Sequence, residues 1–174
     1  MKEKGGAMEE KAILYTSKAG HARQYAKMLA SRLGIPAIEF GTEHLAKDDP
    51  VVFVGWIRAG NVVGLDEALS RYQIRAIGTV GLRYQNLQLV DNLQGRCGGA
   101  KVFYLQGGFE PSKLKGLNRL VIKLAAKAMA RNLKRKNPRT ADEEAMLELL
   151  QKGGSRVAMD ALDPMVHALK DSGE

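Results

Sequence analysis

The sequence predicts an α/β fold in which a doubly wound parallel sheet of five strands lies between two layers of helices. Short apolar runs without strict polar alternation occur along the chain, which is typical of strands buried on both faces. Segments with apolar residues at helical spacing separate these runs, and this alternation is the pattern of right-handed βαβ units. The 174 residues are one domain's worth of chain and can bury a sizeable core.

Strands and helices alternate in the first two thirds of the chain. The predicted strands are residues 12–16, 36–40, 51–57, 75–80 and 101–106. The predicted helices between them are residues 20–33, a short one at 42–47, 65–72 and 86–93. We expect the strand order 2-1-3-4-5, which places a ligand beyond the carboxyl ends of strands 1, 3 and 4.

Further helices are predicted after the fifth strand. An amphipathic basic helix at about 113–136 comes first, and Thr140 with Glu143 then predicts a capping box for a second helix, which a Gly-Gly pair ends. A last short helix from Asp163 to about 169 is expected to close one edge of the sheet. We therefore expect a single three-layer α/β/α domain at 11–170, with disordered residues at 1–10 and 171–174.

Composition excludes several classes of protein. The chain is 45% hydrophobic and 26% charged, and no apolar run approaches the roughly 20 residues of a membrane span. Residues 1–11 lack the apolar centre of a signal peptide, and the single cysteine, Cys97, fits a reducing compartment, so we expect a cytoplasmic protein. Cys97 precedes the fifth strand, away from the expected ligand edge. His44 and His167 are isolated from other ligand-type residues, so we expect no metal site.

The net charge of +8 comes from one segment. Residues 113–139 hold ten of the 27 basic residues and no acidic one, which leaves 17 basic against 19 acidic residues elsewhere. Three interpretations stay open. The segment is a sheet-covering helix with a solvated outer face, a helix that lies on anionic lipid, or a nucleic-acid surface. The last is the weakest, because no aromatic platform or nucleic-acid motif accompanies the charge.

The turn between the first strand and the first helix is the most informative segment. Hydroxyl residues and a glycine precede an amphipathic helix, whose first N–H groups lack intrahelical partners and lie at the positive end of the helix dipole. Such a turn binds an anion such as a phosphate, although ordinary helix capping has the same local sequence. The residues of this turn are Thr16, Ser17, Lys18, Ala19, Gly20, His21 and Ala22.

Two further loops reach the same predicted edge of the sheet. Trp56 either stacks on a ligand there or packs in the core. Arg58 and Arg83 either hold an anionic group or remain solvated. The loop after the third strand contains Trp56, Ile57, Arg58, Ala59 and Gly60, and the loop after the fourth contains Thr79, Val80, Gly81 and Leu82.

These loops resemble those of flavodoxin-like domains. The first loop is similar to the phosphate loop of that family, except that its last position, usually Thr, is Ala22. A closer similarity is to the branch that contains the menaquinone-dependent protoporphyrinogen dehydrogenases and related flavodoxin domains, and this branch fits a basic chain better than the acidic flavodoxins do. The motifs that carry it are Gly55-x-Ile57-Arg58-x-Gly60, Thr79-Val80-Gly81, and Gly107-Gly108-Phe109 followed by the basic helix.

The resemblance implies a flavin site built from the three loops. FMN would place its phosphate in the first loop and its ring against Trp56 and Ile57, with the backbone of residues 79–81 along the pyrimidine end. It implies electron transfer through a non-covalent flavin that needs no catalytic side chain. A quinone, a tetrapyrrole or a redox protein would be the electron partner.

Three functions follow as hypotheses. The first is an FMN-binding oxidoreductase or electron-transfer protein, with the more specific alternative of a protoporphyrinogen IX dehydrogenase that uses a quinone acceptor at the inner face of the membrane. The second is a flavodoxin-fold binding module that has lost its cofactor, which Ala22 favours. The third is a basic protein that binds a membrane or a nucleic acid. The sequence leaves the oligomeric state open, including a homodimer.

Overall fold

The computed structural model describes residues 9–83 and 86–171 of the chain. The fold is α/β with a mostly parallel central sheet, as the sequence predicts, and the described residues contain six α-helices. Most of the tail expected at 1–10, and residues 172–174 of the expected disordered end, lie outside the described residues. No helix within the described ranges combines the length and the apolar character needed to cross a membrane.

Six strands form the central sheet. The parallel strands are β1 (Ala12–Thr16), β2 (Ala37–Glu39), β3 (Pro50–Arg58), β5 (Gln73–Gly81) and β6 (Lys101–Gln106), along the path β2-β1-β3-β5-β6. The sixth strand is β4 (Asn61–Val62), which the sequence does not predict. It pairs antiparallel with the end of β3, because Ala59 and Gly60 both have positive φ and make the tight turn of a hairpin.

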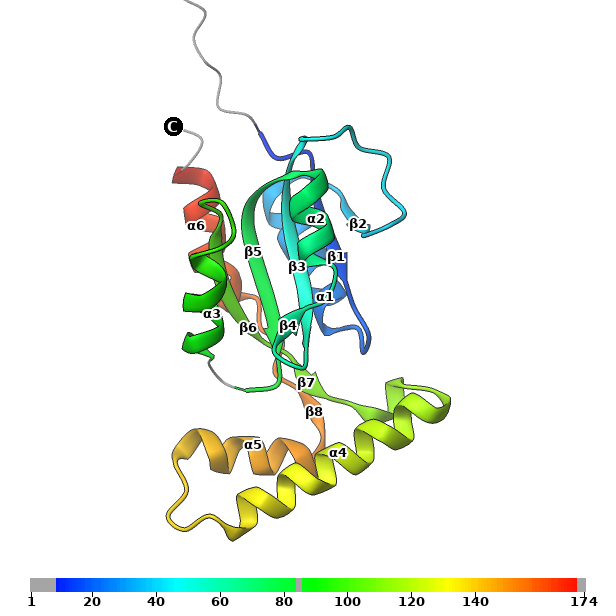
Figure 1. Ribbon diagram of the computed structural model, residues 1–174, viewed down its shortest axis with the longest axis vertical. Coiled ribbons are helices and arrows are strands. Elements are labelled where there is room, and N and C mark those ends of the chain that lie inside the picture. Colours follow the sequence, from blue (N-terminus) through cyan, green and yellow to red (C-terminus); the bar gives the residue numbers. More distant parts are fainter. Residues whose placement is uncertain (1–8, 84–85, 172–174) are drawn as a thin grey trace, which may run out of the picture.

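Helices cover both faces of the sheet (Figure 1). α1 (His21–Leu33) and α6 (Asp163–Asp171) share one core with Ile13 and Val52. α2 (Leu65–Arg71) and α3 (Leu87–Gln94) share the opposite core with Leu14 and Phe53. The prediction that the last helix closes a sheet edge is wrong, because α6 packs on the face of β5 and β6 beside α1.

The short helix predicted at 42–47 does not form. Local side-chain hydrogen bonds hold this segment as a loop: the Thr42 hydroxyl donates to the Glu39 carbonyl, and the Asp49 carboxylate accepts from the Ala46 N–H. Such bonds offer the backbone an alternative to helical pairing, which explains why the apolar spacing alone was misleading here.

A helical hairpin, residues 110–153, extends from the carboxyl end of the sheet (Figure 1). It contains the 3-10 turn η1 (Pro111–Lys113), α4 (Gly116–Arg135) and α5 (Ala141–Lys152). A two-stranded ribbon of β7 (Gly108–Phe109) and β8 (Gly154–Ser155) joins it to the sheet, and η2 (Asp160–Leu162) leads back to α6. α4 packs against α5 and η1, so the interpretation of the basic segment as a sheet-covering helix is wrong.

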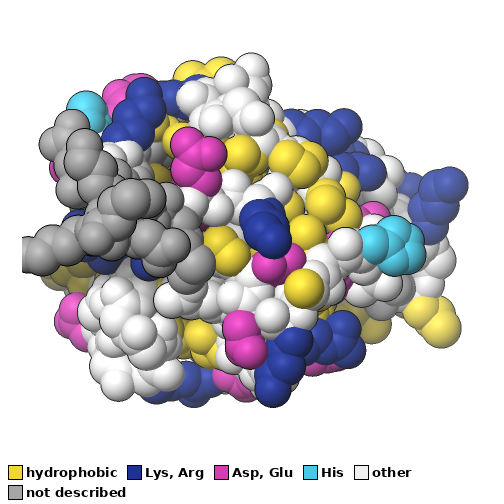
Figure 2. All heavy atoms as spheres, turned by 90° about the horizontal axis from the view of Figure 1, so that it is seen from above, with side chains coloured by type: hydrophobic (Ala, Val, Ile, Leu, Met, Phe, Trp, Pro, Cys, Tyr) yellow, Lys and Arg dark blue, Asp and Glu magenta, His cyan; other side chains and the backbone are white. Residues whose placement is uncertain are grey.

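Charge is distributed differently at the two ends of the molecule. The end opposite the helical hairpin shows basic and acidic side chains interspersed with apolar ones (Figure 2). In contrast, the segment from Lys113 to Arg139 contains no acidic residue. The net positive charge of the chain is therefore concentrated on the helical hairpin.

Candidate functional site

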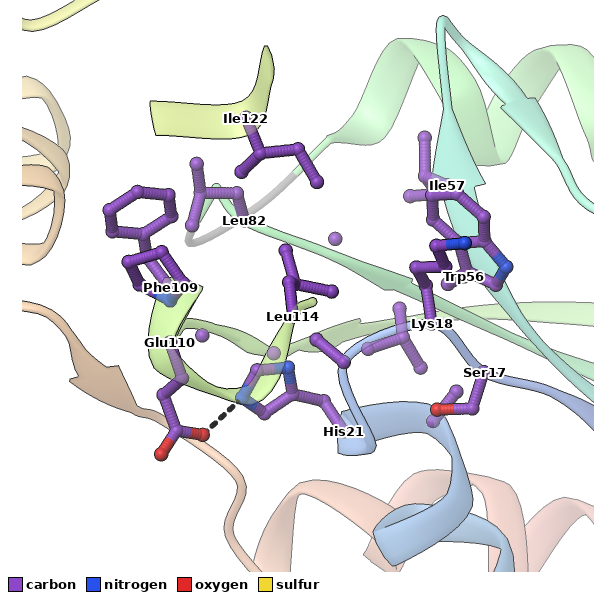
Figure 3. Close-up of a pocket in the computed structure, with 17 residues that line it drawn as sticks. Ser17, Lys18, His21, Trp56, Ile57, Leu82, Phe109, Glu110, Leu114 and Ile122 are labelled. Atoms are coloured by element: carbon purple, nitrogen blue, oxygen red, sulfur yellow. Dashed lines mark hydrogen bonds and ion pairs between the residues drawn. The ribbon is translucent and has the colours of Figure 1, made fainter. Parts of the chain in front are cut away.

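A pocket of about 170 Å³ lies at the carboxyl ends of β1, β3, β5 and β6 (Figure 3). Three loops of the sheet form its base and sides, and the helical hairpin forms its roof. The residues that line it are Ser17, Lys18, Ala19, His21, Ala22, Trp56, Ile57, Val80, Gly81, Leu82, Gly107, Gly108, Phe109, Glu110, Pro111, Leu114 and Ile122.

The first side of the pocket is the start of α1. Gly20 precedes the helix with φ of 96°, a left-handed conformation that favours glycine, and no side chain among the described residues caps the helix. Ser17 Oγ accepts a hydrogen bond from the Gly20 N–H at 3.1 Å, which leaves the hydroxyl proton of Ser17 available to a ligand. The first N–H groups of α1 and this hydroxyl therefore offer donors beside the positive end of the helix dipole.

The neighbouring Thr16 has a different role. Its Oγ1 donates to the carbonyl of Val63 at 2.7 Å and so ties the end of β1 to the loop before α2. Because the one hydroxyl proton is used there, Thr16 does not supply the ligand donor that the sequence suggested. It also lies outside the set of pocket-lining residues.

The second side of the pocket is an apolar slot. Trp56 and Ile57 from the end of β3 lie across from Leu82, Leu114 and Ile122 (Figure 3). Gly81 leaves room for the neighbouring side chains, because a Cβ there would lie 2.4 Å from Tyr104 Oη and 2.9 Å from Ile57 Cδ1.

Tyr104, on β6, is held next to Gly81. Its hydroxyl donates to the Arg83 carbonyl at 2.9 Å, and burial raises its pKa to about 12. The phenol therefore stays neutral at physiological pH and acts as a structural support for the loop after β5.

An ion-paired cluster connects the roof to the base. His21 Nε2 lies 2.7 Å from Glu110 Oε2, and Lys113 Nζ donates to the same oxygen at 2.9 Å (Figure 3 shows the first contact). His21 is only 6% exposed, at the first turn of α1. The hydrogen bond from Lys113, followed by that from His21, lowers the pKa of the Glu110 carboxyl. This cluster ties the helical hairpin to the side of the pocket that the start of α1 forms.

Most of the predicted site residues meet at the pocket, and some do not. Gly20 acts through the backbone of the α1 turn, and Thr79 is fully buried with its hydroxyl donating to the Phe103 carbonyl at 3.1 Å. Arg58, Ala59 and Gly60 form the exposed tip of the β3–β4 hairpin instead of a pocket wall. The predicted residues that line the pocket are Ser17, Lys18, Ala19, His21, Ala22, Trp56, Ile57, Val80, Gly81 and Leu82.

The roof is the part that the sequence did not reveal. The Gly107-Gly108-Phe109 motif carries part of the family resemblance, but the sequence places neither this motif nor the basic helix at the pocket. A signal was present in the paired glycines: a Cβ on Gly108 would lie 2.4 Å from the Gly154 carbonyl and 2.8 Å from His21 Nε2. The roof residues are Phe109, Glu110, Pro111, Leu114 and Ile122.

Other reactive side chains lie away from this pocket. Cys97 is buried in the core beneath α3, and burial raises the pKa of its thiol. His44 and His167 are exposed. Among the residues that the structure describes, no cluster of His, Cys, Asp and Glu could hold a metal ion.

Comparisons of the chain with protein-family models, with curated proteins and with solved structures gave no match.

Proposed function

We propose that this chain is a flavodoxin-like protein that binds FMN in the pocket at the carboxyl ends of β1 and β3 and transfers electrons through it. One observation carries the proposal: the uncapped start of α1 and an apolar slot open into the same pocket. When β4 is set aside, the path β2-β1-β3-β5-β6 becomes the order 2-1-3-4-5. In sheets of that order the ligand binds where the path reverses, between the first and third strands.

The phosphate would bind at the start of α1. The Ser17 hydroxyl and the first backbone N–H groups of the helix supply neutral donors, and the exposed Lys18 supplies a positive charge at the pocket wall. Ala22, where the resembling family usually has Thr, is 1% exposed and packs in the core with Tyr25. Binding of the phosphate therefore depends on the donors of Ser17 and the backbone.

The flavin ring would lie in the apolar slot, where its bound form supplies one- and two-electron transfer. Trp56 and Ile57 would contact one side of the ring, and the roof residues Leu114 and Ile122 the other. The pocket of about 170 Å³ is smaller than the roughly 300–1,000 Å³ of sites that enclose a whole ligand. Part of the ring would therefore stay at the mouth, within reach of an electron partner.

A titration with FMN tests this proposal directly. Trp56 is the only tryptophan and lines the pocket, so its emission reports occupancy of the pocket itself. We expect saturable quenching of Trp56 emission and of flavin fluorescence with the same Kd, and a shift in the visible absorption bands of the flavin. Absence of any binding would contradict the proposal and favour the binding module without a cofactor.

A matched pair of variants locates the phosphate. Ser17→Asp keeps an acceptor for the Gly20 N–H but places a negative charge beside the phosphate, and it should raise the Kd for FMN at least tenfold. Ser31→Asp, on the exposed face of α1, makes the same charge change away from the pocket and should leave the Kd unchanged. Equal effects of the two variants would place the phosphate elsewhere. Quinones and porphyrinogens are the first electron partners to test on the FMN-loaded protein.

A further inference from the structure

α4 has apolar residues on two opposite sides. Its inner side, with Ile122 and Ala126, faces the pocket and α5. On the other side, residues spaced at i, i+3, i+4 and i+7 form a second stripe that no other described element covers. This outer stripe contains Leu117, Leu120, Val121 and Leu124, which are 80%, 55%, 61% and 59% exposed.

Four cations adjoin the outer stripe. Lys123, Lys127, Arg131 and Lys134 lie along the groove between α4 and α5, which we call the basic groove, above an apolar floor that includes Leu150. None of the four has an ion-pair partner among the described residues, whereas Lys136 and Arg139, at the end of α4, pair with the acidic start of α5. These four cations therefore flank the outer stripe along the edge of α4 that borders α5.

The combination of these two surfaces selects one kind of partner. A second copy of the chain would bring cations against cations, because α4 contains no acidic residue. A nucleic acid would match the basic groove but would set the large side chains of the outer stripe against its phosphates. An anionic bilayer satisfies both surfaces, since apolar side chains enter the boundary of the acyl region while the cations contact lipid phosphates.

We propose that α4 docks on an anionic membrane surface, with the outer stripe in the interfacial layer and the basic groove at the lipid headgroups. The 20 residues of α4 would lie along the surface. Ile122, on the inner side of the same helix, lines the pocket. Because a helix with its side chains is about 10–12 Å across, docking would hold the pocket within that distance of the bilayer. The proposal does not depend on the identity of the ligand in the pocket.

Sedimentation of the full chain with vesicles tests the docking. We expect binding to vesicles of phosphatidylcholine with phosphatidylglycerol that increases with the fraction of phosphatidylglycerol and decreases with added salt. Binding to pure phosphatidylcholine vesicles should be weak. No vesicle binding, or equal binding to neutral and anionic vesicles, would overturn the proposal.

Two double variants separate the apolar and the charged contributions. Leu120→Gln with Leu124→Gln, and Lys123→Glu with Lys127→Glu, should each lower the vesicle partition coefficient at least tenfold. The controls are Leu87→Gln, which alters an exposed apolar residue on α3, and Lys27→Glu with Lys170→Glu, which makes the same charge change on α1 and α6. Both controls should stay within twofold of the unaltered chain. If the α4 variants and the controls lower the vesicle partition coefficient equally, the assignment of the membrane contact to α4 is wrong.

Two further measurements test whether a second copy of the chain or a nucleic acid binds this surface instead. Light scattering during size-exclusion chromatography reports the oligomeric state, and fluorescence anisotropy reports binding of a labelled DNA duplex. We expect a monomer whose mass none of the variants changes, and DNA binding weaker than vesicle binding at the same salt concentration. A dimer that only the Leu120→Gln, Leu124→Gln variant dissociates would overturn the proposal in favour of self-association.

Discussion

Two adjacent hydroxyl residues at the end of β1 have different functions. Thr16 is a structural donor to the Val63 carbonyl, whereas Ser17 accepts from the loop and keeps its proton for a ligand. The strand explains the difference, because successive side chains of a strand point to opposite faces and the end of β1 directs Thr16 towards the loop before α2. Sequence alone gives both residues the same chemistry, so only their placement separates them.

Thr16→Val tests this structural role. The substitution keeps the shape of the side chain but leaves the Val63 carbonyl without its donor, so we expect a loss of about 1–2 kcal/mol in the free energy of unfolding. Thr16→Ser retains the hydroxyl and should lose less. Urea unfolding at pH 7 measures both, and a fully stable Thr16→Val protein would contradict the assignment. The Kd for FMN should change little in either variant.

Glu110 predicts a pH dependence of stability. Its pKa is lowered in the folded protein by Lys113 and His21, so its ionised form stabilises the fold above the ordinary carboxyl pKa of about 4.3. This stabilisation is lost as the pH falls through the lowered pKa. Because the cluster is partly screened by solvent, we expect Glu110→Gln to cost about 1 kcal/mol at pH 7, or about 2–4 °C in Tm.

The difference in stability between the Glu110→Gln variant and the unaltered chain should therefore shrink as the pH is lowered below about 4.3. Glu148→Gln is the matched control, because Glu148 pairs with Lys152 on the exposed surface of α5. Lys152 also lowers the pKa of the Glu148 carboxyl, but solvent screens this exposed pair, so the loss of stability and its change with pH should be much smaller for Glu148→Gln than for Glu110→Gln. A stability difference for Glu110→Gln that is independent of pH would show that the carboxylate charge has no role in the cluster.

Local signals made one side of the site predictable, and long-range pairing made the other side unpredictable. Ser17, Gly20 and His21 lie within one turn, so a strand, a glycine and a helix start are enough to place them together. Glu110 reaches His21 from 89 residues away in the chain, and no periodicity encodes that contact. Only the structure therefore shows that Glu110 lies at the pocket.

At the scale of elements, the ribbon of β7 and β8 decides where the roof lies. Gly107 and Gly108 follow β6 directly, and the Arg156 N–H donates to the Gly107 carbonyl at 2.8 Å, which extends the pairing beyond β8. The ribbon therefore fixes the direction in which the helical hairpin leaves the sheet. α4 and the capping box of α5 are predictable from the sequence, since both depend on local patterns. The two-residue strands β7 and β8 are not, because they are too short to show any periodicity.

Gly108→Ala should separate the two strands of this ribbon, β7 and β8. The added Cβ would lie 2.4 Å from the Gly154 carbonyl, a contact that backbone atoms can relieve only by moving apart. We expect the helical hairpin to lose hydrogen-exchange protection while the sheet keeps its protection. Gly95→Ala is the control, because Gly95 has a helical φ of −71° and its nearest atom to an added Cβ is 3.9 Å away. Unchanged protection of residues 110–153 in Gly108→Ala would contradict the role of the ribbon.

At the scale of the whole molecule, the two cores lie on the sheet and not in the helical hairpin. Leu14 is fully buried beneath α2 and α3, whereas Leu124 is 59% exposed on α4. Leu14→Ala should therefore cost about 3 kcal/mol and about 6–12 °C in Tm. Leu124→Ala should change the stability by less than about 0.5 kcal/mol. Thermal unfolding followed by circular dichroism compares the two, and a large loss from Leu124→Ala would show that the outer stripe is part of a core.

The fold class was predictable from sequence because the hydrophobic pattern of a parallel sheet is strong. β1 and β6 have the predicted bounds, and the bounds predicted for α1, α2 and α3 differ from the observed ones by no more than one residue at each end. The place of α4 was not predictable, because the sequence shows an amphipathic helix without showing which partner covers it. Its inner side is apolar enough to suggest a sheet contact, yet α5 and the pocket are its actual neighbours.

The antiparallel pairing of β7 with β8 makes the helical hairpin a self-contained insertion in the fold. The two ends of residues 110–153 lie side by side at the β7–β8 ribbon, so this segment is an insertion between β6 and α6. Insertions or deletions within residues 110–153, or replacement of the whole segment, would leave the register of every parallel strand intact. Substitutions in the helical hairpin would therefore alter access to the pocket while the parallel strands keep its base in place.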